Sequence, residues 1–99
     1  MTITKSTAIH PGEILRELYL EPWDMSAYAL ARHLNIPRTW IERMVAEKLG
    51  ITPDTALRLA KFFKTTPEYW LNLQNAFDIK SAAAMLEADL AAIKELEAA

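Results

Sequence analysis

Residues 26–45, with the sequence SAYALARHLNIPRTWIERMV, constrain the fold more than any other part of this chain. Ser26 is suited to cap a helix, because its hydroxyl can accept a hydrogen bond from an amide of the first turn. Asn35 tolerates the left-handed backbone at which many helices end, and Pro37 is favoured at the first position of the next helix. The segment is therefore predicted to form a helix-turn-helix, which presents its second helix to the major groove of DNA.

The second of these helices, predicted to start at Pro37 and to end at Gly50, has a buried side and an exposed side. Ile41 and Val45 lie four residues apart and are predicted to face the core. The side chains predicted to face outward are those of Arg38, Thr39, Trp40, Glu42 and Arg43. These five residues are the candidate reading surface.

Start and stop signals indicate three further helices. One begins at Pro11 and ends at Pro22, and Trp23 is expected to fill the corner that follows. The other two begin after Thr52 and Thr66, because each threonine precedes a proline and an acidic residue, as is typical of a helix N-terminus. The apolar residues of the last of these helices, predicted to lie in the core, are Trp70, Leu73 and Phe77.

The alanine-rich segment from Ser81 to the end of the chain predicts a sixth helix, with Leu86, Leu90, Ile93 and Leu96 along one side. Such a helix is marginal alone and needs a surface to pack on, either its own domain or a second chain. No segment alternates polar and apolar residues as a strand does. The predicted fold class is all-α: a five-helix helix-turn-helix domain over residues 9–78, then a C-terminal helix over residues 79–99 for packing or dimerisation.

The composition excludes several classes of function. A chain of 99 residues fits one domain, and the absence of cysteine excludes disulfides and thiolate metal sites. No apolar run approaches the ~20 residues that cross a bilayer, so we expect no membrane contact and a cytoplasmic location. His10 and His33 have no partners at ligand spacing and are expected to be surface or capping residues. We identify no catalytic residues, no metal site and no cofactor, and expect that the protein is not an enzyme.

The net charge of −2 argues mildly against nucleic-acid binding, because lysine and arginine supply most of the affinity for phosphates. The acidity is, however, confined to the C-terminal segment. Residues 1–79 contain nine basic and nine acidic side chains, whereas residues 80–99 contain two basic and four acidic ones. The predicted DNA-binding part is thus neutral, and two copies side by side would strengthen its attraction to DNA.

A resemblance to a known family rests on four segments in this order: HPGEILRE, LEPWDMSAYALARHLNIPRT, ITPDTALRLAKFF and TTPEYWLNLQ. Together they resemble the HigA (VapI-like) antitoxins, a branch of the XRE, phage-repressor-like, helix-turn-helix family. The resemblance covers roughly residues 9–78. It implies a lambda-repressor-like domain that forms a homodimer, binds a palindromic operator in double-stranded DNA, represses its own operon and neutralises a HigB-like toxin that cleaves messenger RNA.

The resemblance also implies which residues bind DNA. Arg38, Thr39, Trp40 and Arg43 occupy the face that points into the groove, and Lys48 lies nearer a phosphate. Either arginine can donate two hydrogen bonds to guanine or bind phosphate, and Thr39 can bond a phosphate or contact a thymine methyl group. Trp40 is a departure, because similar antitoxins usually carry a basic residue there.

Trp40, Met44 and Leu49 support an alternative hypothesis. Similar antitoxins often have another basic residue at the position of Leu49, and Trp40 and Met44 are adjacent on the helix surface. The three could form an exposed apolar patch, diverged or engineered to bind another protein. Otherwise Trp40 packs across a sugar or the start of the fourth helix, and Arg38, Thr39 and Arg43 recognise DNA. A third hypothesis is toxin neutralisation without DNA binding.

Overall fold

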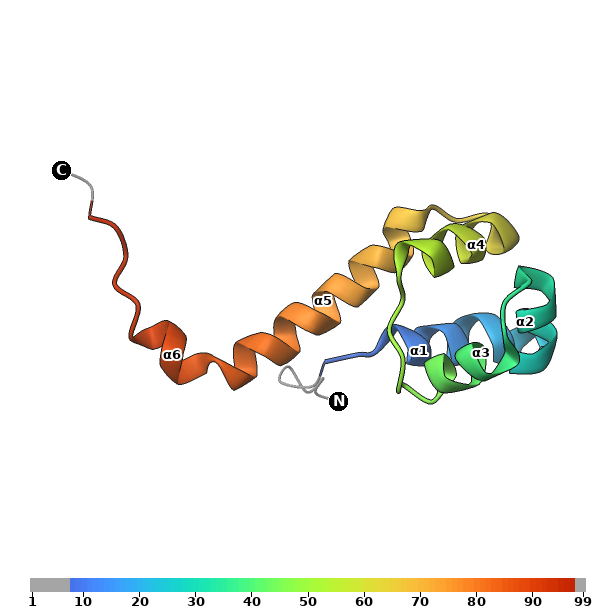
Figure 1. The fold of residues 1–99 in the computed structure, drawn as a ribbon, viewed down its shortest axis with the longest axis horizontal. Helices are drawn as coiled ribbons and strands as arrows, with labels where there is room; N and C mark the ends of the chain where they lie inside the picture. Colours follow the sequence, from blue (N-terminus) through green and yellow to red (C-terminus); the bar gives the residue numbers. More distant parts are fainter. Residues whose placement is uncertain (1–7, 98–99) are drawn as a thin grey trace.

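The computed structural model describes residues 8–97, and this part of the chain is helical with no β-strand (Figure 1). The elements are α1 (Pro11–Ile14), the π-helical segment η1 (Leu15–Leu20), the 3-10 segment η2 (Glu21–Trp23), α2 (Ala27–Leu34), α3 (Arg38–Val45), α4 (Pro53–Phe63), α5 (Pro67–Met85) and α6 (Glu87–Ala91). The all-α fold class is therefore confirmed.

The first predicted helix is a continuous stretch of three helical types, α1, η1 and η2. It continues past Pro22 and ends at Asp24, whose backbone is left-handed with φ of 52°. Leu20 is buried and Met25 packs against the core beside it, and the two residues are joined by a backbone hydrogen bond of 2.9 Å. The prediction that Trp23 fills this corner is wrong: its side chain is 75% exposed, because Leu20 and Met25 occupy the space.

The start of α1 is fixed by one local cap and by contacts with α5 and α3. His10 caps the helix, since its Nδ1 accepts a hydrogen bond of 2.8 Å from the amide of Gly12. The His10 ring is buried and packs edge-on against Phe77 at 4.8 Å. Gly12 lies against α3: a Cβ at this position would come within 1.8 Å of the carbonyl oxygen of Met44. Only a residue without a side chain permits this approach.

Most core side chains come from η1, α2, α3, α4 and the first turn of α5. The fully buried large residues of the core are Leu15, Leu30, Ile41, Met44, Leu59 and Trp70. The indole of Trp70 donates a hydrogen bond of 2.8 Å to the hydroxyl of Thr65, which satisfies its polar atom. Tyr19 packs against Trp70 with 4.9 Å between ring centroids, and burial raises the pKa of Tyr19 to about 12. The prediction of Trp70 as a core residue is confirmed, whereas Leu73 and Phe77 are half-buried.

The predicted boundary between the fifth and sixth helices is wrong. Thr66 caps α5 as predicted, but α5 continues through Ser81 to Met85, and only the short α6 follows. Figure 1 shows α5 projecting away from the other helices, with α6 beyond it. Residues 92–97 are not helical. The alanine-rich segment has high helix propensity, but it lacks a packing surface that would stabilise a separate long helix.

Within residues 8–97, the C-terminal segment has a set of exposed apolar side chains. They are Ile79, Met85, Leu86, Leu90, Ile93 and Leu96. None of the helices within residues 8–97 is long and apolar enough to cross a bilayer.

Replacing Gly12 by alanine is expected to destabilise the fold by about 1–3 kcal/mol, because the new methyl group would force α1 and α3 apart. The free energy of unfolding can be measured by urea denaturation. Gly50→Ala is the control, since its methyl group would meet only the end of the Gln74 side chain at 3.0 Å. Equal losses in both variants would contradict the tight contact between Gly12 and Met44.

His10 is expected to make stability depend on pH below 6.5. Desolvation by burial lowers its pKa from the ordinary value of 6.5, although Glu47 and Asp78 oppose the shift. The unfolded chain therefore takes up a proton first, so the stability from His10 is complete above pH 6.5 and is lost as the pH falls through the lowered pKa.

Urea denaturation at pH 7.5 and 5.5 tests this dependence. His10→Asn keeps a capping side chain that does not titrate, and this variant should lose less stability between the two pH values than the unmodified chain. His33→Gln, at an exposed position, should leave the difference unchanged. An undiminished difference in His10→Asn would rule out His10 as its source.

Candidate nucleic-acid interface

The turn between α2 and α3 has the geometry predicted from its sequence. The Ser26 hydroxyl accepts a hydrogen bond of 3.0 Å from the amide of Ala29, and Asn35 is left-handed, with φ of 59° and ψ of 47°. The amide of Ile36 then bonds back to the carbonyl of Ala31 at 3.1 Å. Pro37 directly precedes α3, which begins at Arg38, one residue later than predicted, because the Pro37 ψ of 139° is extended.

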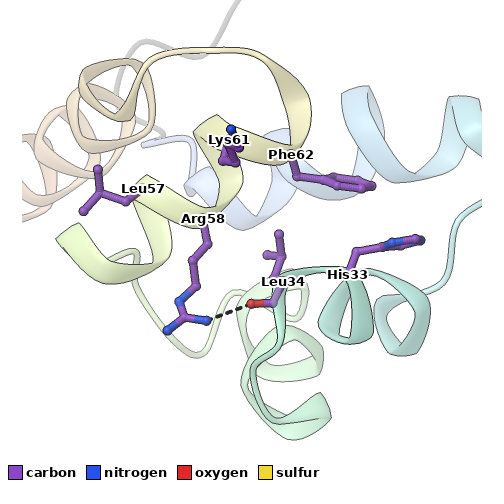
Figure 2. A pocket seen from close by; sticks show the side chains of 6 residues that line it. All are labelled: His33, Leu34, Leu57, Arg58, Lys61 and Phe62. Atoms are coloured by element: carbon purple, nitrogen blue, oxygen red, sulfur yellow. Dashed lines mark hydrogen bonds between the residues drawn. The ribbon is translucent and has the colours of Figure 1, made fainter.

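Arg58 of α4 holds this turn in place (Figure 2). Its guanidinium donates hydrogen bonds to the carbonyl oxygens of Leu34 at 2.8 Å and Asn35 at 3.2 Å. Asp54, one helical turn earlier, pairs with the same guanidinium at 2.6 Å. These carbonyls end α2 and lack helical partners, so Arg58 both satisfies them and fixes the position at which α3 begins.

The other end of α3 is held by α1 and its continuation. Gly12 lies against the carbonyl of Met44, and the guanidinium of Arg16 donates a hydrogen bond to the carbonyl of Val45. Arg16 also pairs with Glu47 at 3.3 Å, and Glu47 has a left-handed backbone with φ of 64°. The helix therefore ends at Val45, earlier than the predicted end at Gly50.

The predicted reading surface is exposed along the whole of α3. Arg38, Thr39, Trp40, Glu42 and Arg43 are all solvent-exposed, and so is Lys48 in the loop that follows. On the opposite side, Ile41 is fully buried and Val45 is half-buried, in agreement with their predicted inward orientation. The structure thus presents the two arginines and the threonine on the solvent-exposed part of α3.

The prediction of an exposed Met44 is wrong. Only 1% of its surface is accessible, because Met44 follows the fully buried Ile41 by three residues and shares its face of α3. Trp40 and Leu49 do lie together, since both line a hollow of about 310 Å³ between α3 and the start of α4. The full lining of this hollow is Trp40, Arg43, Leu49, Gly50, Thr52 and Thr55. The candidate apolar patch is therefore reduced to Trp40, which is 49% exposed, and the half-buried Leu49.

Two partners of Arg38 were not predicted from the sequence. Glu42 lies one turn further along α3, and its carboxylate is 3.2 Å from Nε of Arg38. Tyr28 of α2 faces the same guanidinium, whose central carbon lies 5.6 Å from the ring centroid. Arg32 lies over the same ring at 5.9 Å. The four-residue spacing of Arg38 and Glu42 is readable in the sequence, whereas the contact with Tyr28 depends on the angle between α2 and α3.

Each of the two histidines contacts another part of the helical domain. His10 caps α1, and His33 stacks on Phe62 with 4.8 Å between ring centroids. Within residues 8–97, no three side chains of the metal-binding types are grouped closely enough to hold an ion.

Comparison with known proteins finds similar proteins that have names, although no protein-family model matches the chain. Virulence-associated protein I of Dichelobacter nodosus is 53% identical over 75 residues, which are 76% of this chain and 69% of that protein. The structure of Pseudomonas aeruginosa antitoxin HigA with the higBA promoter is 37% identical with a TM-score of 0.89, over 92% of this chain and 100% of that one. The antitoxin GraA in complex with its operator is 38% identical with a TM-score of 0.87, over 99% of this chain and 100% of that one.

Proposed function

The chain belongs to the HigA-like (VapI-like) helix-turn-helix antitoxins, and on that basis we propose that it is a transcriptional repressor that places α3 in the major groove of a palindromic operator. The observation that carries this proposal is the exposure of Arg38, Thr39 and Arg43 on a helix that is held at both ends. A rigid helix limits the entropy lost when these side chains meet DNA. Lys48 lies beyond the end of α3, where it can reach a phosphate.

A homodimer is the second part of the proposal. The C-terminal segment, residues 79–97, exposes Leu86, Leu90, Ile93 and Leu96, and a second copy can cover these apolar side chains. Residues 9–78 then supply the DNA-binding domain, and residues 79–99 join the two subunits. Two subunits also double the few positive charges facing DNA, which a neutral domain needs in order to bind phosphates.

The remaining activities follow from the family. We propose that the protein neutralises a HigB-like toxin, autoregulates the operon that encodes both, and acts in the cytoplasm. Several of its relatives are named as HTH-type transcriptional regulators or antitoxins, which supports a non-enzymatic role. Neutralisation of the toxin without DNA binding would leave the exposed arginines of α3 with no ligand.

A protein-binding surface centred on Trp40 is the second candidate function. The hollow that Trp40 shares with Leu49 favours it, because an exposed tryptophan beside a hollow is a common anchor at protein interfaces. The burial of Met44 makes this patch smaller than the sequence indicated. We therefore rank it below DNA binding, in which Trp40 can lie against a sugar or a thymine methyl group.

Binding to a duplex from the promoter upstream of the gene should weaken steeply as salt is raised, because bound arginines and lysines release counterions from DNA. Fluorescence anisotropy titrations over a salt series measure this affinity. The stoichiometry of binding should be two chains per palindromic site. Arg43→Ala should weaken binding and reduce the slope of log K against log salt by about one per subunit. Lys61→Ala, which removes a positive charge from α4, is the matched control. Absence of salt-sensitive binding at low ionic strength would exclude the repressor.

Trp40 should report which ligand it meets. With 5-fluorotryptophan in the chain, the three tryptophans give separate 19F resonances, and Trp40→Phe assigns one of them. Promoter DNA is expected to shift the Trp40 resonance and leave that of Trp70 unchanged, because Trp70 is fully buried in the core. A Trp40 resonance whose chemical shift does not change when DNA binds would instead favour the protein-binding surface.

A further inference from the structure

The guanidinium of Arg38 is held from two directions. The Glu42 carboxylate approaches Nε at 3.2 Å, and the Tyr28 ring lies 5.6 Å from the central carbon, within the range of a cation–π contact. Both partners come from the helix-turn-helix itself, one from α3 and one from α2. An exposed arginine samples many rotamers, and two contacts on one side chain reduce that number before any ligand is bound.

These contacts leave the ligand-binding part of Arg38 available. Glu42 lies on the Nε side, and within residues 8–97 no ion pair involves the two terminal amino groups. The Arg38 side chain remains 59% exposed. These two groups can form the pair of parallel hydrogen bonds with which arginine recognises O6 and N7 of guanine.

The Glu42 carboxylate distinguishes between the two kinds of site that Arg38 could contact. A phosphate at Arg38 would lie close to Glu42, and the two negative charges would repel each other. At the floor of the groove the same carboxylate faces base edges, and it can accept a hydrogen bond from the N4 amino group of cytosine. The ion pair therefore favours a base over the phosphate backbone.

Arg43 provides the contrast on the same helix. It is exposed, and no acidic group within residues 8–97 lies within 4.0 Å of it. An arginine without a carboxylate neighbour is free to bind phosphate, so the two arginines of α3 are chemically unequal although the sequence presents them alike.

We propose that Arg38, Glu42 and Tyr28 act as one base-reading unit: Arg38 donates to a guanine, Glu42 is a specificity-determining residue that keeps Arg38 off the phosphates, and Tyr28 is a positioning residue that holds the guanidinium. The proposal deepens the proposed DNA-binding function and rests on it. It predicts that sequence preference and overall affinity can be separated by mutation.

The experiment is a binding selection from duplexes with a randomised segment of roughly three helical turns, long enough for two half-sites. It uses the full chain and the variants Arg38→Ala, Glu42→Gln, Tyr28→Leu, Tyr28→Phe and Arg43→Ala. The unmodified chain should enrich a palindromic sequence. Arg38→Ala should lose the preference for one G·C pair in each half-site of that sequence. Glu42→Gln and Tyr28→Leu should weaken that same preference by roughly tenfold, the scale of one bidentate contact.

The other variants test the assigned roles. Tyr28→Phe keeps the ring and should restore the preference, and Glu42→Gln should bind an unrelated duplex several-fold more tightly because it loses a negative charge. Arg43→Ala should lower affinity for all sequences without altering the preferred bases. Full preference in both Glu42→Gln and Tyr28→Leu, or effects at different base pairs, would overturn the unit while leaving the repressor intact. Enrichment of no sequence by the unmodified chain would overturn both.

Discussion

The close contact between Gly12 and the Met44 carbonyl is the constraint on which the exposed part of this molecule depends. It brings the start of α1 against the end of α3, so that the Arg16 guanidinium can reach the Val45 carbonyl and the Glu47 carboxylate. A helix of eight residues has little stability of its own and needs such tertiary contacts. The His10 cap supports the arrangement by fixing the backbone on which Gly12 lies. The exposed arginines of α3 are therefore presented by a helix that owes its position to contacts on its far side.

Much of the fold could be predicted because its boundaries are set by local chemistry. The caps at Ser26 and Thr66 and the left-handed Asn35 are each determined by one side chain and the next few residues, and the structure contains all three. The wrong predictions concern features that depend on how side chains pack in the folded chain. Trp23 has the size to fill a corner, but Leu20 and Met25 already occupy it. High propensity predicted a separate long helix from Ser81, whereas α5 continues through Ser81 to Met85 and only the short α6 follows.

The candidate site divides in the same way. Helical periodicity identified the outward positions of α3. Residues three and four positions after the buried Ile41 can both share its face, and the sequence alone favoured Val45 over Met44 as the second buried residue. The structure buries Met44 and half-buries Val45. The pairing of Arg38 with Tyr28 crosses two helices, so its prediction needs the crossing angle that the turn imposes. Sequence patterns locate the surface; the unequal environments of its two arginines emerge only from the folded chain.

The outward side chains of α3 contribute almost nothing to the core. This affects how related proteins can evolve. Arg38, Thr39, Trp40, Glu42 and Arg43 are all exposed, while Ile41 and Met44 anchor the helix from below. Substitution at the five outer positions leaves the interior packing intact, and exposed substitutions of this kind usually alter stability by less than about 0.5 kcal/mol. Duplicated copies of such a gene can therefore drift toward new targets without first losing their fold, and one scaffold can diversify into many regulators that ignore one another's control regions.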